Sequence, residues 1–225
     1  MQVVADYHTH THYSDGEGSI EANIEAAIER ELEEVAVADH GPASRTWRQA
    51  GVDNPETLLE IKRKAEKYNR LYPEIKVLSA VEANIIGCDG QLDVPQNILQ
   101  ELDKVLVGFH LFIRPVSWRA AKAIIIDNLL LEPVGINRQE IRTHNTELVI
   151  KTLRRYDVDI MTHPGFQVNL DTPALARAAR EQQTALEINA SHAEELIDFG
   201  AAAEEEGVEF CLGSDAHCPQ EVGEV

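Results

Sequence analysis

The sequence predicts an α/β fold, a single barrel of parallel strands with its functional site at one rim. Three observations favour this fold: strand-like and helix-like segments alternate along the chain, no glycine-rich nucleotide-binding motif follows the first strand, and polar residues end nearly every predicted strand. Barrel enzymes build their sites at the rim where the carboxyl ends of the strands converge. In an open sheet the same ends would lie along a line too long for one site.

Seven apolar segments are expected to form the strands. They span residues 2–8, 33–40, 75–85, 104–110, 158–163, 184–189 and 208–217. Helical patterns lie between them, at 19–32, 56–72, 95–102, 118–135 and 146–156, and the stretches 172–182 and 192–207 separate the last strands. Ser19 is a candidate N-cap for the first helix, and Pro73 closes the second. Strands alternating with helices in this way favour parallel pairing with right-handed crossovers.

Composition and charge narrow the functional classes. The 225 residues are 44% hydrophobic and 26% charged, as expected for one globular domain spanning 1–225. A net charge of −19 argues against nucleic-acid and anionic-membrane partners, whose surfaces require positive charge. Three cysteines without CxxC spacing predict neither a disulfide framework nor a zinc ribbon. With no signal peptide and no apolar run approaching the ~20 residues of a membrane span, we expect a cytoplasmic protein.

The segment "DYHTHTHYSDG", residues 6–16, places histidines at three alternate positions, His8, His10 and His12. On an extended strand, residues two apart point to the same side. His8 and His10 can therefore reach one ion above the strand end.

Further polar residues lie within or at the ends of the other predicted strands. They are His40, Glu82, His110, His163, Glu187, Asn189, Asp215 and His217. Glu82 lies inside the apolar "LSAVEANI", where an unpaired carboxylate costs several kcal/mol, so it requires a cation. Imidazoles and carboxylates without a thiolate suit Zn²⁺, Mn²⁺ or Fe²⁺. The candidates are too many for one ion, so we expect two or three, and hydrolysis is the first reaction class to consider.

Six segments, "HTHTHYSDG", "VADHGP", "VEANI", "GFH", "THPG" and "LGSDAH", closely resemble the PHP (polymerase and histidinol phosphatase) family in order and spacing. The resemblance covers nearly the whole chain. It implies a distorted, TIM-like (β/α)7 barrel with a trinuclear metal site at the C-terminal ends of the strands. It also implies a hydrolase acting on phosphoric ester bonds.

The resemblance further implies which residues hold each ion. His8 and His10 with Glu82 and Asp215 would hold the first ion, His12, His40 and His217 the second, and His110 and His163 the third, with Glu82 as a bridge. A metal-bridging hydroxide, held by Glu82 and Asp215, would then attack phosphorus. The match at His12 requires a shorter loop than many relatives have. Asp39 is a candidate to orient a ligand, whereas His144 and His192 match no ligand position and are expected at the surface or at helix caps.

Arginines are the usual ligands of phosphate because the planar guanidinium matches two phosphate oxygens. Arg114 follows a ligand-bearing strand, and Arg45 and Arg48 follow "DHGPAS", so these are candidates for substrate binding. The stretch 111–136 between two strands is interpreted as a buried helix, with a lid or a dimer contact as alternatives.

Three functions compete on this basis. The first is a small-molecule phosphomonoesterase, with histidinol phosphate or a nucleotide among the possible substrates. The second is a nuclease-like or polymerase-associated PHP module, which the acidic charge disfavours. The third is a metal-binding module without turnover. An amidohydrolase barrel also begins with HxH, but its dinuclear members typically carry a lysine where this chain has His110. The chain ends eight residues after His217, which leaves the helix expected after the last strand unassigned.

Overall fold

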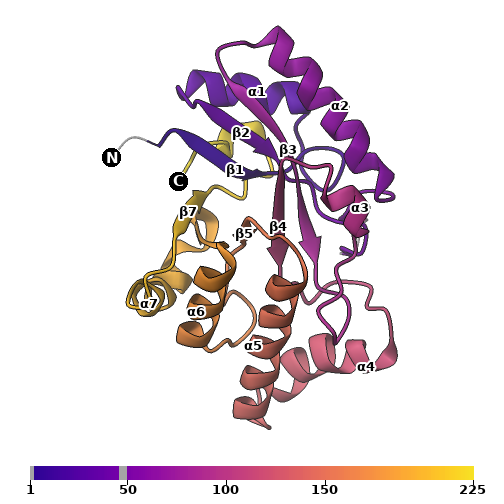
Figure 1. The fold of residues 1–225 in the computed structure, drawn as a ribbon, viewed down its shortest axis with the longest axis vertical. Helices are drawn as coiled ribbons and strands as arrows, with labels where there is room; N and C mark the ends of the chain where they lie inside the picture. Colours follow the sequence, from indigo (N-terminus) through magenta and orange to yellow (C-terminus); the bar gives the residue numbers. More distant parts are fainter. Residues whose placement is uncertain (1–2, 46–49) are drawn as a thin grey trace.

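Seven parallel strands in sequential order form the centre of the molecule in a computed structural model, which describes residues 3–45 and 50–225 (Figure 1). The strands are β1 (Ala5–Thr9), β2 (Glu34–Val37), β3 (Lys76–Asn84), β4 (Lys104–Gly108), β5 (Ile160–Met161), β6 (Ala185–Asn189) and β7 (Phe210–Gly213). Every neighbouring pair from β1 to β7 is parallel. The order is that of a barrel built from successive right-handed units.

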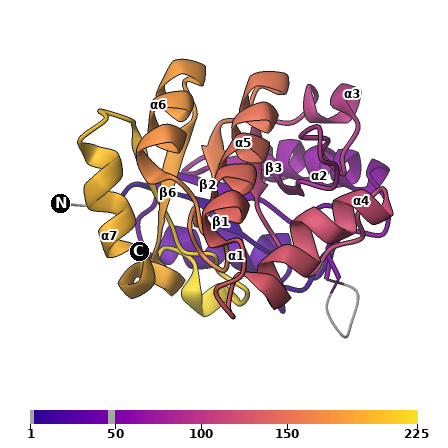
Figure 2. The ribbon, with the colours of Figure 1, turned by 90° about the horizontal axis from the view of Figure 1, so that it is seen from below.

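Helices connect the strands and pack around them, and α5 and α6 lie side by side (Figure 2). The α-helices are α1 (Ile20–Glu29), α2 (Glu56–Leu71), α3 (Gln96–Leu99), α4 (Trp118–Ala120), α5 (Arg138–Arg155), α6 (Thr172–Gln182) and α7 (Ala193–Glu204). A π-helix (Ala121–Leu131) continues α4, and 3-10 turns occupy Ala190–His192 and Pro219–Glu221. Ser19 caps α1, since its side chain accepts a hydrogen bond from the N–H of Ala22 at 3.1 Å.

Alternation along the strands creates two apolar layers. One layer lies between the strands and the helices and contains Val35 and Val37 of β2 with the α2 stripe of Leu58 and Ile61. The other is a separate, small cluster of the intervening residues: Ala36, Ala38, Leu78, Ala80, Leu106 and Ile160. Because side chains alternate along a strand, Glu82 of β3 continues the line of Leu78 and Ala80 toward the rim. This alternation directs the functional side chains inward.

The seam between β7 and β1 closes by a few contacts. Thr9 and Ala216 form an isolated parallel bridge, and the N–H of His10 donates to the carbonyl of Ala216 at 2.8 Å. The buried carboxylate of Asp6 spans the same seam, accepting from Ser214 Oγ at 2.6 Å. The barrel is therefore nearly closed and distorted, which confirms the predicted fold class.

Two helical segments differ from the sequence prediction. Helix α5 begins at Arg138, eight residues before the predicted start, and its first turns escaped prediction because they carry little apolar pattern. The stretch predicted as a buried helix contains the π-helix Ala121–Leu131, in which only Ile124 and Asn128 are buried, while Leu130 is 62% exposed. The expectation of burial is therefore wrong for most of this stretch. Asn128 and Asn145 join the two helices through reciprocal amide hydrogen bonds of 3.2 and 2.7 Å.

Across the described part of the chain, no helix combines the length and the apolar character needed to cross a membrane. The three cysteines, Cys88, Cys211 and Cys218, are free thiols.

Candidate metal centre

Glu82 is fully buried on β3, and imidazoles face both of its carboxylate oxygens. Oε1 lies 2.9 Å from His163 Nε2 and 3.2 Å from His110 Nε2, and it accepts a hydrogen bond from Thr162 Oγ1 at 2.7 Å. Gly108 makes this approach possible, because a Cβ there would lie 2.2 Å from a carbon of the His110 ring. One oxygen of Glu82 thus faces the ends of β4 and β5.

The second oxygen, Oε2, faces β1 and the end of β2. It lies 2.7 Å from His40 Nδ1, 3.4 Å from His8 Nε2 and 3.9 Å from His10 Nε2. Asp215, just after β7, brings its Oδ1 to 3.1 Å from His10 Nε2 and 3.5 Å from His8 Nε2. We name His8, Glu82, His110 and His163 the inner cluster. The two oxygens of the Glu82 carboxylate therefore face two different sets of imidazoles.

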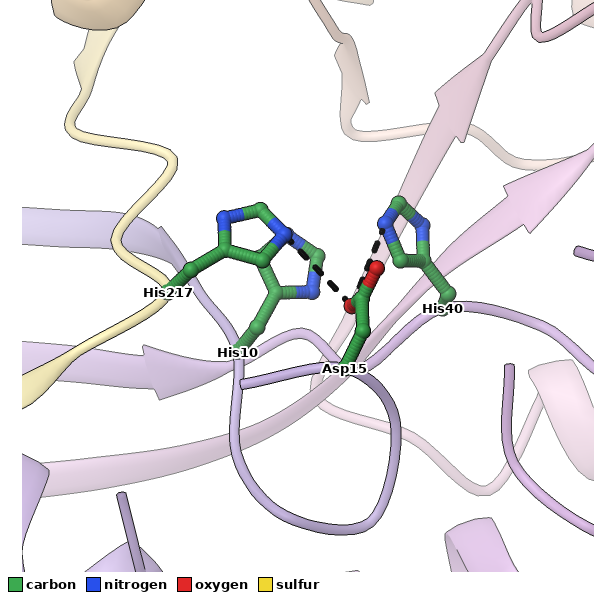
Figure 3. Close-up of side chains that lie close together, drawn as sticks. All are labelled: His10, Asp15, His40 and His217. Carbon is green, nitrogen blue, oxygen red and sulfur yellow. Dashed lines mark ion pairs between the residues drawn. The ribbon is translucent and has the colours of Figure 1, made fainter. Parts of the chain in front are cut away.

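A second arrangement, which we name the outer cluster, consists of His10, Asp15, His40 and His217 (Figure 3). Asp15 Oδ1 lies 3.7 Å from His40 Nε2 and 3.4 Å from His217 Nε2. The rings of His10 and His217 stack with centroids 4.4 Å apart. His217 Nδ1 donates to the carbonyl of Asp215 at 2.9 Å, which leaves its Nε2 directed at Asp15.

The structure does not bring His12 into either cluster. Its side chain is exposed, its Nδ1 lies 3.2 Å from the carbonyl of Gly18, and its ring stacks on Tyr13. Strand β1 ends at Thr9, so the alternation that aligns His8 with His10 stops before residue 12. Asp15 occupies the place that was predicted for His12.

Asp39 holds the loop that carries Asp15. Its buried carboxylate accepts hydrogen bonds from Thr11 N at 2.8 Å, Thr11 Oγ1 at 2.7 Å and Ser14 Oγ at 2.6 Å. The predicted orienting role of Asp39 thus takes the form of a loop anchor. The sequence signal for Asp15 was the polar turn "YSDG" directly after the strand.

Glu187 of β6 fixes the orientation of two imidazole-bearing residues. Because a carboxylate only accepts, His8 Nδ1–H donates to Glu187 Oε1 at 2.7 Å, which leaves His8 Nε2 directed at Glu82. The other oxygen accepts from the main-chain N–H of His163 at 2.9 Å and from Asn189 Nδ2 at 3.0 Å.

His192, expected at the surface or at a cap, lies at the edge of the centre. It directly precedes α7, but its side chain makes no capping hydrogen bond to this helix. Its Nε2 lies 3.9 Å from Asp215 Oδ2. Its ring stacks on Phe166 with centroids 3.6 Å apart and meets the ring of His163 edge-on. His144 lies on α5, outside both clusters.

Electrostatics hold the two carboxylates ionised. Burial alone would raise the pKa of Glu82 and Asp215, but the surrounding imidazoles lower both well below the usual range. Burial, reinforced by neighbouring imidazoles, lowers the pKa of His10 to about 3. Burial also opposes the charge on His217, but its contact with Asp15 and the nearby Asp215 raise that pKa to about 9. In the metal-free protein the same carboxylates outweigh burial and raise the pKa of His8, His40 and His163, so the centre combines ionised carboxylates with imidazoles that balance their charge, while His10 stays unprotonated.

The donor set fits divalent cations. Among the described residues, three groups of side chains place one ligand atom each within 4.8 Å of one another: the outer cluster, His8 with His10 and Glu82, and His40 with Glu82 and His110. His8 Nε2 and Glu82 Oε2 are buried without a hydrogen-bond partner although they lie 3.4 Å apart. A lone pair facing a carboxylate oxygen is satisfied by a cation between them.

The two arginine-bearing loops pair with each other. Ser44 and Ile113 form an antiparallel bridge, the N–H of Arg45 donates to the carbonyl of Phe112 at 2.8 Å, and the N–H of Arg114 donates to the carbonyl of Ala43 at 2.9 Å. The Arg114 side chain is exposed and that of Arg45 is half-buried. The third candidate, Arg48, lies outside the described residues.

Fold and site together define an α/β barrel with a rim centre of histidines and carboxylates able to bind divalent metal. Residues 6–197 match the PHP domain, and this chain belongs to that family. The match confirms the predicted family and hydrolase class. A protein of Acetivibrio thermocellus named "Probable phosphatase" is 30% identical over 234 residues, which cover 99% of this chain and 83% of the relative. A "Probable phosphatase" of Edwardsiella ictaluri is 31% identical over 232 residues, covering 99% and 79%.

Two solved structures share the fold. A histidinol phosphate phosphatase from Lactococcus lactis, complexed with zinc, L-histidinol and phosphate, has a TM-score of 0.64 at 16% identity and covers 96% of this chain and 86% of its own. A candidate histidinol phosphatase from Listeria monocytogenes has a TM-score of 0.71 at 17% identity and covers 97% of both chains.

Proposed function

We propose that this protein is a metal-dependent phosphomonoesterase with two or three divalent ions, acting on a small phosphorylated substrate. The observation that carries the proposal is Glu82, whose two oxygens each face a different set of imidazoles. A carboxylate shared in this way is suited to bridging two ions. Zn²⁺, Mn²⁺ and Fe²⁺ all accept this donor set. Family membership and the names of the relatives support phosphate-ester chemistry.

The residues of the chain have separable tasks in such a reaction. Ions held by the two clusters would supply an activated water and neutralise the charge of the phosphate. Asp15 takes the ligand position earlier assigned to His12. Glu82 and Asp215 stay ionised at neutral pH and hold the negative charge that retains the cations. Glu187 keeps the lone pair of His8 directed inward.

Substrate binding is assigned to Arg45 and Arg114. Pairing of their loops brings the two main-chain segments together beside the end of β3. Among the described residues, neither guanidinium makes an ion pair, so both are available to phosphate oxygens.

The test is phosphate release by manganese- or zinc-loaded protein. The panel contains histidinol phosphate, sugar phosphates, nucleoside mono- and bisphosphates and short single-stranded DNA. We expect inorganic phosphate from a small monoester, and a loss of more than ~100-fold in Asp215→Asn, because even residues behind the ligands cost 10–100-fold. Asparagine suits this position, whose φ is 57° and which therefore favours Asp, Asn or Gly.

The matched control is His12→Ala, which removes an imidazole outside both clusters. Release of nucleotides from DNA ends, in place of phosphate from monoesters, would contradict the proposal in favour of a nuclease. Absence of turnover across the panel, with metal shown to be bound, would contradict it in favour of a non-catalytic metal-binding module.

A further inference from the structure

Asn84 determines which nitrogen of His110 carries the proton. It is fully buried on β3, and its Oδ1 lies 2.7 Å from His110 Nδ1. An amide oxygen only accepts hydrogen bonds, so the ring proton is on Nδ1 and His110 Nε2 presents a lone pair to Glu82 and the inner cluster. His110 can serve as a ligand only while Asn84 keeps this orientation, since the opposite one would place the amide NH₂ against Nδ1.

Asp93 in turn fixes the orientation of Asn84. Asn84 Nδ2 donates to Asp93 Oδ2 at 2.7 Å, and the main-chain N–H of Asn84 donates to Asp93 Oδ1 at 2.8 Å. Ser44 Oγ contacts both ends of the same amide, at 2.9 and 3.1 Å, and a hydroxyl can either donate or accept. A carboxylate only accepts. Asp93 is therefore the partner that directs the NH₂ group away from His110.

Asp93 also holds the main chain that precedes Arg45. Its Oδ2 accepts from the N–H of Ala43 at 2.9 Å. The carbonyl of Ala43 accepts from the N–H of Arg114, so one carboxylate supports both arginine-bearing loops. Gly41 permits this approach, because a Cβ at that position would lie 2.4 Å from Asp93 Oδ2.

We propose that Asp93 is a positioning residue with two roles: through Asn84 it selects the Nδ1–H tautomer of His110, and through Ala43 it fixes the two arginine-bearing loops. This inference rests on the proposed metal-dependent function. Asp93 itself is not assigned to a metal ion or to substrate. Its carboxylate couples His110, two residues after β4, to the loop after β2.

The first test is Asp93→Asn, which preserves shape but allows the side chain to donate as well as accept. Asn84 can then turn, and long-range ¹H–¹⁵N spectra of the metal-free protein should show the Nε2–H tautomer of His110. Mn²⁺ affinity, measured by calorimetric titration, should fall by about 10–100-fold. Inhibition by inorganic phosphate should weaken as well. The matched control is Asp89→Asn, which changes an exposed aspartate in the same loop that pairs with Arg155, and it should alter none of these three quantities.

Exchanging the side chains of Asn84 and Asp93 distinguishes a positioning role from a general effect on the stability of the fold. In the double variant Asn84→Asp/Asp93→Asn, the carboxylate next to His110 can only accept, so the Nδ1–H tautomer and the Mn²⁺ affinity should return close to wild type. The Ala43 N–H loses its charged acceptor in the same variant. Inhibition by phosphate should therefore stay weak although the metal affinity recovers.

Two results would overturn this proposal: an unchanged tautomer and Mn²⁺ affinity in Asp93→Asn, or a loss of affinity that the swap does not restore. A wild-type protein that binds no metal would instead overturn the proposed function. The tautomer of His110 in the metal-free protein still tests the positioning role in that case.

Discussion

The inner and outer clusters use the same kinds of side chain but are held by different parts of the fold. Two of the four inner residues, His8 and Glu82, lie on strands and are inaccessible to solvent, and the other two, His110 and His163, each lie two residues after a strand. The outer cluster depends on Asp15, which is exposed and comes from a loop held by Asp39. The pleat of a strand fixes where a side chain points, whereas a loop residue is placed by its own hydrogen bonds.

The largest effect is expected at Glu82, whose two carboxylate oxygens face different imidazoles. Glu82→Gln removes the charge that faces five imidazoles, so metal content and phosphate release should both fall by more than ~100-fold. The metal-free variant should also lose about 3–5 kcal/mol of unfolding free energy, because protonated histidines are left without their buried partner. Elemental analysis and urea unfolding measure these changes. A Glu82→Gln variant with normal metal content would contradict the proposal that this carboxylate is shared by two metal ions.

The second effect compares Asp15 with His12. Asp15→Asn should reduce Mn²⁺ affinity and turnover by about 10–100-fold, because it removes the carboxylate between His40 and His217. His12→Ala should leave both within the experimental error. Equal losses in the two variants would show that the outer cluster extends to His12.

The third effect concerns substrate. Arg45→Ala and Arg114→Ala should each raise KM by about tenfold with little change in metal content, since a charge-assisted hydrogen bond contributes roughly 1.5–3 kcal/mol and these side chains are partly solvated. Arg119→Ala, an exposed arginine shortly after Arg114, is the control. A fall in metal content with unchanged KM would show that the two arginines support metal binding and not substrate binding.

The fourth effect is the pH dependence of the metal-free protein. His217, with a pKa raised to about 9, stabilises the fold below its ordinary value of 6.5, and this contribution is lost as pH rises through 9. His10, with a pKa lowered to about 3, costs stability as pH falls from 6.5 toward 3. Stability from urea unfolding should therefore be highest near neutral pH. In Asp15→Asn, the free energy of unfolding should fall less as the pH rises toward 9. An unchanged pH dependence in this range would contradict the contact between Asp15 and His217 as the cause.

The comparison also shows which parts of the site could be predicted from sequence. His8, His40 and Glu82 could be predicted, because a polar residue within or at the end of an apolar segment is a strong signal. Asp15 was missed because the continued histidine alternation pointed to His12, and the chain turns before that residue.

The barrel was predictable because short apolar segments that end in polar residues alternate with helical patterns along the chain. The π-helix was not, because "AIIIDNLLL" is apolar on all sides and gives no face to assign. The early start of α5 was missed because Ile141 is the only apolar side chain in residues 138–145, so these turns carry no apolar stripe.

The most direct test of the shared carboxylate is an anomalous-scattering map of manganese- or zinc-loaded crystals. We predict at least two peaks, one on each side of Glu82, at about 2.0–2.2 Å from its oxygens and from the facing histidine nitrogens. A single peak, or peaks that leave either oxygen of Glu82 without a metal contact, would contradict the account.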